Sequence, residues 1–129
     1  MPIRGIRGAV PVKANTKAAI TAATRLLLQR IVSSNRLELG DIAGAILTAT
    51  PDLNADFPAA SARGLGWRDV PLLCAQEIDV PGSMPRVVRV LLFVNSDRPQ
   101  SEMRHVYIGA ASRLRPDLAG RRSLSGRRT

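Results

Sequence analysis

The first part of the chain changes from a strand-like to a helix-like spacing of hydrophobic residues. Residues 3–12 alternate between larger apolar side chains and small or charged ones, a period of two that predicts a strand. Pro11 restricts this strand to the edge of a sheet or to a strand end. Apolar residues then recur at spacings of three and four up to about Asn35, which predicts an amphipathic helix with Asn15 or Thr16 as its N-cap.

The rest of the chain combines one short helix with continuous apolar runs. Pro58 near the start and Gly64 near the end of PAASARGL predict a helix over residues 58–65. Apolar runs predict four more strands, at residues 42–50, 70–75, 86–95 and 105–114. The order of these elements predicts an α/β fold (α+β mixed), with a mixed five-stranded sheet and two main helices.

Two helices are too few to cover both faces of such a sheet. The runs at 42–50 and 86–95 are apolar on both faces, a pattern typical of strands that are buried on both sides. We therefore expect that one face of the sheet is covered by another subunit and that the protein is an oligomer.

Length and charge indicate one modestly basic domain with a basic tail. The chain has 129 residues, the size of a single domain, and we assign residues 1–118 to it. Residues 119–129 are rich in Arg, Ser and Gly and lack apolar periodicity, so we expect them to form a disordered tail. Of the net charge of +9, the last ten residues contribute +4, which leaves +5 for the rest.

Composition excludes several classes of function. Aromatic residues make up 3% of the chain, too few for the base-stacking surfaces of single-stranded nucleic-acid-binding domains. One cysteine rules out an internal disulfide, and with His105 as the one histidine, which we expect to be structural, no metal site is expected. No apolar run is long enough to span a membrane, and the N-terminus lacks the apolar core of a signal peptide. We expect no nucleic-acid or membrane partner and a cytoplasmic location.

Arg89 is the most informative position, because its charge lies inside a hydrophobic strand. Both faces of the run at 86–95 are apolar, so its guanidinium must emerge among hydrophobic side chains. A buried cation without a partner is very costly. Two interpretations are equally consistent with the residues. One is an internal salt bridge, most obviously to Glu77, and the other is an anion site in which the guanidinium faces a ligand oxygen.

Other charged and polar residues add a weaker signal. Arg7, Arg63 and Arg115 lie beside apolar runs; each alone is typical of a surface charge, but together they indicate a small polyanion such as a dicarboxylate. Cys74, in an apolar run, is typical of a buried and unreactive thiol. Tyr107 is either a donor to an anion or a half-buried strand aromatic. Since no nucleophile–base pair is evident, an enzyme with this sequence would act by binding and electrostatics.

Four segments together resemble the AroH-class chorismate mutases. They are RGIRGA (4–9), ATPDLNADFPAASAR (49–63), VPLLCAQEIDVPGSMPRVVRVLL (70–92) and RHVYIGAASRLRPDL (104–118), and the resemblance runs in order over about residues 3–118. It implies a homotrimer assembled as a trimeric pseudo-barrel, with sites in the clefts between subunits. It also implies the Claisen rearrangement of chorismate to prephenate, on the route to phenylalanine and tyrosine, with no cofactor and no metal.

The same resemblance implies roles for individual residues. Arg89 matches the arginine that donates to the ether oxygen of chorismate, where negative charge grows as the C–O bond breaks. Glu77 and Cys74 match residues that meet the substrate hydroxyl. The remaining matches are Arg7 and Tyr107, which hold a carboxylate; Phe57, Ala59, Leu72 and Leu73, which form an apolar wall; Leu114 and Arg115, at a C-terminal lid; and Arg63, which with Arg115 draws in the substrate. Ala60 stands where some members of the family carry a lysine, so one peripheral cation is missing.

A function of a different class stays open at this point, namely a non-catalytic basic module that binds a small carboxylate or RNA. Nucleic-acid contacts would be made by lysines and arginines on the surface. The interior strand positions of Arg89 and Glu77 therefore favour the enzyme.

Overall fold

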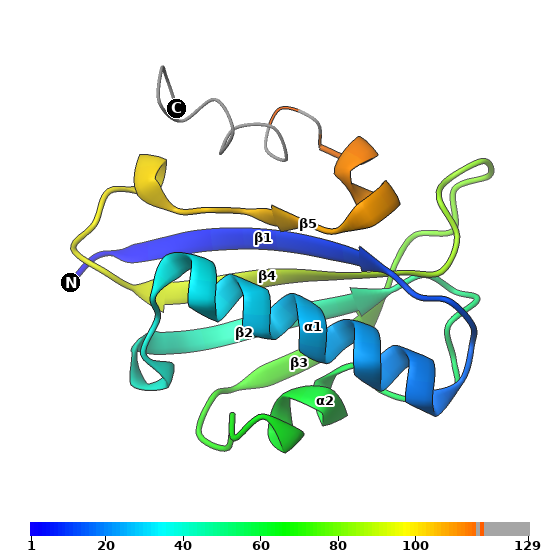
Figure 1. Ribbon diagram of the computed structural model, residues 1–129, viewed down its shortest axis with the longest axis horizontal. Helices are drawn as coiled ribbons and strands as arrows, with labels where there is room; N and C mark the ends of the chain where they lie inside the picture. The colour runs from blue at the N-terminus through cyan, green and yellow to red at the C-terminus, as the bar shows by residue number, and fades with distance from the viewer. Residues whose placement is uncertain (116, 118–129) are drawn as a thin grey trace.

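Residues 1–115 and 117, the part of the chain that the computed structural model describes, form a five-stranded mixed sheet with two α-helices on one face (Figure 1). In chain order the elements are β1 (Ile3–Pro11), α1 (Lys17–Asn35), β2 (Ile42–Ala49), α2 (Ala59–Gly64), β3 (Leu72–Gln76), β4 (Val87–Asn95) and β5 (Val106–Tyr107). Short 3-10 turns cover Leu39–Asp41, Gln100–Glu102 and Gly109–Arg113. The predicted fold class is confirmed. The tail predicted at 119–129 lies outside the described residues.

The strand order in the sheet places β4 at its centre. The order is β3-β2-β4-β1-β5, and β4 is antiparallel to both β1 and β2. The edge strands β3 and β5 run parallel to β2 and β1, respectively. The central place of β4 accounts for its β-branched sequence, which is apolar on both faces, because it has a neighbouring strand on each side and side chains packed above and below.

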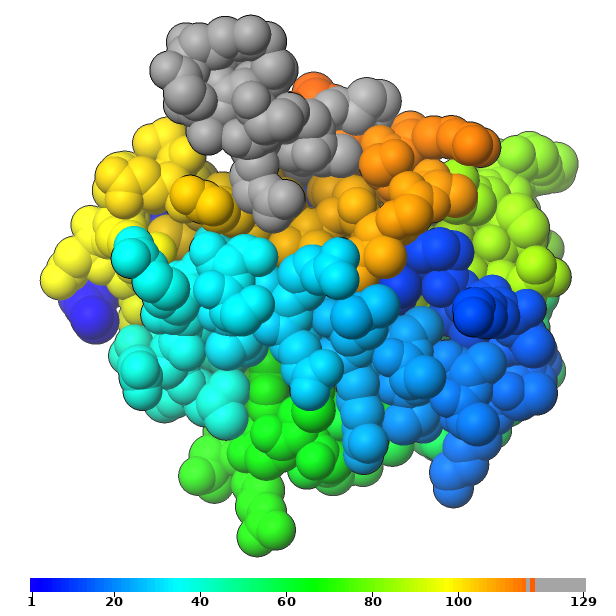
Figure 2. Space-filling model, viewed as in Figure 1, coloured from blue at the N-terminus to red at the C-terminus, as the bar shows by residue number. Residues whose placement is uncertain are grey.

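The helices cover one face of the sheet and form the main core with it. The side chain of Thr16 is the N-cap of α1 and accepts from the Ala19 amide at 3.1 Å, which settles the choice between the two candidate caps. Seen from this side, α1 and α2 hide most of the sheet (Figure 2). The main buried contributors are Ile20, Leu27, Leu28 and Ile31 of α1, Ile6 and Val10 of β1, Leu47 of β2, and Val88, Val90, Leu92 and Val94 of β4.

The opposite face of the sheet is largely open. Among the described residues no α-helix covers it, and it presents alternate residues of the strands, including Arg7 of β1, Thr48 of β2, and Arg89 and Leu91 of β4. Leu73 on the edge strand β3 is 62% exposed. A small cluster closes one end of this face, formed by Ala9, Met84, Val87, Tyr107, Ala111 and Leu114. Within residues 1–115 and 117, this face of the sheet therefore has no second layer of helices.

The predicted boundaries of two strands were wrong, and the missing N–H of a proline explains a large part of each error. The final strand, predicted at 105–114, is β5 alone, and the chain then turns into a 3-10 segment beginning at Gly109, whose φ is +55°. Pairing with β1 stops after Ala9, because Pro11 has no N–H to donate to a further strand residue. The strand predicted at 70–75 begins at Leu72 because Pro71 likewise cannot donate to a ladder.

Gly8 allows α1 to lie close against β1, and its replacement by alanine should show this. A Cβ on Gly8 would lie 2.9 Å from the side chains of Leu27 and Ile31, and 3.0 Å from the Val106 carbonyl oxygen. We expect Gly8→Ala to lower the free energy of unfolding by about 1–3 kcal/mol through overpacking, measured by denaturant titration. Gly5→Ala is the matched control on the same strand, since the nearest atom to its added Cβ is 3.9 Å away. Equal stability of the two variants would contradict this account of the packing.

Candidate active site

The charge of Arg89 is met by Glu77 on the open face of the sheet. Arg89 stands in β4, and its Nε lies 3.0 Å from Glu77 Oε2. Glu77 directly follows β3, and its backbone N–H donates to the Ala49 carbonyl at 3.0 Å, which holds the residue against the end of β2. The Arg89 and Glu77 side chains are 31% and 13% exposed, so the attraction is screened less than in a surface pair.

The salt bridge offered as one interpretation of Arg89 is therefore present. The Arg89 Nε–H is not aligned on the carboxylate as in a hydrogen bond, so the contact is an ion pair held by charge. Because the side chain keeps some exposure on the open face, the same guanidinium can also meet a ligand. The two interpretations are compatible in this geometry.

Thr48 is a site residue that the sequence analysis missed. Its hydroxyl donates to Glu77 Oε2 at 2.7 Å, the same oxygen that lies near Arg89. Thr48 on β2 is the register partner of both Arg89 on β4 and Ala75 on β3. Only the strand pairing places this threonine beside the ion pair, and nothing in the spacing of residues 42–50 indicates that pairing.

Tyr107 and three arginines gather at the same end of the open face. Ala9 is the register partner of both Arg89 and Tyr107, so these two side chains flank β1. Burial raises the pKa of the Tyr107 phenol, while the positive charges of Arg7, Arg115 and Arg89 act in the opposite direction. The Tyr107 hydroxyl is buried and has no hydrogen-bond partner among the described residues, which leaves it available as a donor.

Two further predicted residues lie at this end of the sheet. Leu114 packs with Tyr107 in the small cluster that includes Val87. Arg115 forms a two-point contact with Asp117, with its Nε and Nη2 atoms 3.0 Å and 2.7 Å from the two carboxylate oxygens. Arg115 is therefore paired in the single chain, at a more exposed position than Arg89.

Side chains, rather than a strand, hold the outer edge of β1 beside Arg7. The Arg7 amide donates to His105 Nδ1 at 2.9 Å. Two residues earlier, Gln100 accepts from the Gly5 amide at 2.8 Å and donates to the Gly5 carbonyl at 2.6 Å. These side chains replace the ladder that the short β5 does not provide, which is in keeping with the structural role expected of His105.

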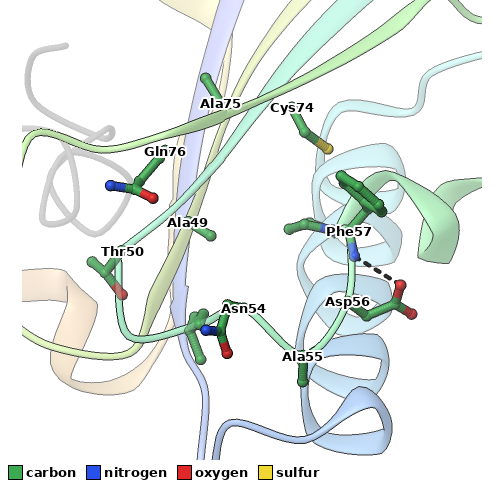
Figure 3. Close-up of a pocket in the computed structure, with 11 residues that line it drawn as sticks. Ala49, Thr50, Asn54, Ala55, Asp56, Phe57, Cys74, Ala75 and Gln76 are labelled. Atoms are coloured by element: carbon green, nitrogen blue, oxygen red, sulfur yellow. Dashed lines mark hydrogen bonds between the residues drawn. The ribbon is translucent and has the colours of Figure 1, made fainter.

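The other predicted residues lie around the outer edge of the sheet, near β3. Phe57 and Cys74 line a hollow of about 370 Å³, and the Cys74 sulfur points towards the Phe57 ring (Figure 3). Phe57 is 72% exposed. Arg63 and Leu72 line a neighbouring hollow of about 410 Å³ together with Trp67 and Arg68. Ala59 of α2 is buried in the main core, so it borders neither hollow.

Within one chain, all the predicted site residues except Leu73 thus fall into two groups. The first group lies on the open face and consists of Arg7, Glu77, Arg89, Tyr107, Leu114 and Arg115. The second group lies on the helix side of the β3 edge and consists of Phe57, Ala59, Arg63, Leu72 and Cys74. Leu73 is separate, pointing out from the open face of the same edge strand. Neither hollow contains a residue of the first group.

The described residues provide neither a metal-ligand cluster nor a membrane span. Within residues 1–115 and 117, no three His, Cys, Asp or Glu side chains are grouped so that they could hold a metal ion. In the same part of the chain, no helix has both the length and the apolar character to cross a membrane.

Comparison with known proteins identifies the family. The family model for "Chorismate mutase type I" matches residues 3–118. The chain belongs to the type I, AroH-type chorismate mutase family. It is 50% identical over 117 residues to a chorismate mutase AroH of Thermus thermophilus, an alignment that covers 90% of this chain and 96% of that protein. It is 45% identical over 120 residues to a chorismate mutase AroH of Bacillus subtilis, covering 92% and 94% of the two chains.

A solved chorismate mutase structure shows the same fold. The enzyme from Clostridium thermocellum superposes with a TM-score of 0.82 at 44% sequence identity, covering 84% of this chain and 96% of that one. The resemblance inferred from the four sequence segments is confirmed, and the type I chorismate mutase family takes precedence over the alternative of a non-catalytic basic module.

The environment of Tyr107 can be tested directly, since it is the one tyrosine of the chain. We expect ultraviolet titration of the folded protein to give a phenol pKa above the ordinary value of about 10, because burial disfavours the phenolate. Arg7→Ala should raise that pKa further, because it removes a cation that favours the phenolate. Arg30→Ala, an exposed position on α1, is the control and should leave it unchanged. A wild-type pKa at or below the ordinary value would contradict this description of the site.

Proposed function

We propose that the Arg89–Glu77 pair on the open face is the reactive centre of this chorismate mutase, an isomerase that converts chorismate to prephenate. The observation that carries the proposal is a paired arginine within an apolar sheet face, with Arg7 nearby and a Tyr107 hydroxyl that no described residue bonds. We further propose that the enzyme serves phenylalanine and tyrosine synthesis in the cytoplasm.

The reaction itself defines what the protein must provide. In a Claisen rearrangement the ether C–O bond breaks as a C–C bond forms within one molecule, and no proton, electron or group is exchanged with the enzyme. No nucleophile, metal or cofactor is required, so the enzyme acts by selecting the reactive conformer and stabilising developing charge. A site of fixed arginines on a packed sheet suits both tasks.

In the proposed mechanism, Arg89 stabilises the charge that develops on the ether oxygen. That oxygen gains negative charge in the transition state, and a cation already in place binds it more strongly there than in the substrate. The position of Arg89 in the central strand supports this role, because its backbone is fixed by neighbours on both sides. Little reorganisation is then needed as the charge appears.

In the same proposal, Glu77 complements Arg89 with a negative charge. Its Oε2 already meets Thr48 and Arg89, whereas its Oε1 has no hydrogen-bond partner among the described residues. In this proposal Oε1 accepts from the substrate hydroxyl, and the carboxylate faces the part of the ring that becomes electron-poor. Arg7 and Tyr107 hold a substrate carboxylate, while Arg115 adds positive charge at the entrance.

The two separated groups of residues support a site shared between subunits. The proposed homotrimer covers the open face of one chain with the edge region of its neighbour. This neighbour supplies the apolar wall with Phe57 and Leu72, the Cys74 thiol as a polar contact to the hydroxyl, and Arg63 as an outer cation. Such an arrangement gives the exposed Phe57 ring and Leu73 side chain a covering partner.

Replacement of Arg89 tests the reactive centre. We expect Arg89→Ala to lower kcat by at least about 10²–10³-fold, the cost of one preorganised donor to a developing oxyanion. Arg89→Lys should recover little of this loss, because a point charge does not reproduce the guanidinium fork. Circular dichroism and gel filtration would establish that both variants keep their fold and assembly, with Arg30→Ala as the control. Most of the kcat surviving in folded Arg89→Ala would remove Arg89 from the mechanism.

Mixing inactive variants tests the shared site. Phe57→Asp damages the second group of residues and Arg89→Ala damages the first. Co-refolded trimers should therefore contain some subunit interfaces at which both groups are intact. Activity should rise well above that of either variant alone, in a proportion set by the mixing ratio. As the matched control, co-refolding Arg7→Ala with Arg89→Ala should give no recovery, because both changes affect the first group. Proven subunit exchange without recovery in the first mixture would mean that one chain supplies both groups.

A further inference from the structure

We infer that Thr48 is a positioning residue of the active site, whose hydroxyl holds the Glu77 carboxylate beside Arg89 in a contact that is not a two-point fork. This inference rests on the proposed roles of Glu77 and Arg89.

Thr48 makes the closer of the two contacts to one carboxylate oxygen of Glu77. Its Oγ1 lies 2.7 Å from Glu77 Oε2, closer than the 3.0 Å between that oxygen and Arg89 Nε. The threonine hydroxyl is itself well fixed, because a β-branched side chain on a strand has few χ1 choices. The Glu77 backbone amide also bonds to Ala49, the residue after Thr48, so both the main chain and the side chain of Glu77 are tied to β2.

An arginine–carboxylate pair can also form a two-point fork, and in our proposal the Thr48 hydroxyl prevents this geometry. Arginine and carboxylate commonly form a fork in which two N–H groups meet two oxygens. In this protein no such fork of hydrogen bonds joins Arg89 and Glu77, whose nearest atoms are Nε and Oε2. A full fork would engage further guanidinium N–H groups and also Oε1, which are the groups that the proposed mechanism offers to the substrate. By holding Oε2, Thr48 keeps those groups available.

Three variants separate positioning from a merely structural effect. Thr48→Val keeps the shape and removes the donor, whereas Thr48→Ser keeps the donor. We expect Thr48→Val to lower kcat/KM by about 10- to 100-fold, the order of one hydrogen bond to a charged group, and Thr48→Ser to stay within about threefold of wild type. The control is Thr24→Val. Thr24 is buried in α1 on the helix side, its hydroxyl has no hydrogen-bond partner among the described residues, and its replacement should leave kcat and KM unchanged.

A coupling measurement tests whether Thr48 acts through Glu77. In a Glu77→Gln background, Thr48→Val should have less than about a third of its effect in the wild-type background, since the charged acceptor is gone. Equal effects in the two backgrounds would overturn the inference. So would a Thr48→Val enzyme within twofold of wild type, or a Thr48→Ser enzyme as impaired as Thr48→Val.

A crystallographic readout distinguishes a failure of this inference from a failure of the proposed function. Crystal structures should show no fork between Arg89 and Glu77 in the wild type and a two-point fork in Thr48→Val. An unchanged carboxylate in Thr48→Val would overturn the positioning role even if the variant shows the expected loss of activity. A wild-type protein without chorismate mutase activity would instead remove the proposed function, and the carboxylate geometry would still decide the role of Thr48.

Discussion

The architecture of this protein depends on placing the charge of Arg89 within the central strand of the sheet. Alternate residues of β4 pack under α1, so the residues between them must point to the open face. A cation there requires a partner, and the path of the chain after β3 supplies Glu77 beside it. The pair is thus a consequence of strand order as much as of residue type. It also leaves a charged centre on a face that no helix of the described part of the chain covers.

This arrangement suits a reaction that exchanges nothing with its catalyst. Acid–base or covalent chemistry would need groups that move protons or form bonds, and such groups are commonly mobile or tuned in pKa. A unimolecular rearrangement gains instead from charges that do not move. The central strand, the tie from Glu77 to Ala49 and the His105 contact to the Arg7 backbone all restrict motion around the site. Rigid placement of this kind is the usual source of electrostatic catalysis.

Local patterns predicted most of the fold, because period-two and period-3.6 spacings report directly on which residues face a core. The long helix, its two candidate caps and the strand that becomes β4 followed from such patterns, whereas the structure decided for Thr16 and placed β4 at the centre. The final strand did not, since the stop at β5 depends on Pro11 of a different strand and on a positive φ at Gly109. Single residues such as Arg89 could be singled out because a charge in an apolar run is anomalous. Thr48 could not, because a threonine in a strand is ordinary until the register places it beside a carboxylate. The roles of Arg7, Cys74 and Tyr107 came from the family resemblance rather than from spacing.

The most direct test of the central claim follows the ultraviolet absorbance of chorismate in the presence of the purified wild-type protein and a metal chelator, with no cofactor added. Conversion to prephenate at a rate proportional to enzyme concentration, unchanged by the chelator, is the result that the electrostatic account predicts. Chorismate loss no faster than the uncatalysed reaction, with protein shown to be folded and assembled, would contradict it. Activity that disappears with the chelator would equally contradict a mechanism built on fixed arginines and a carboxylate alone.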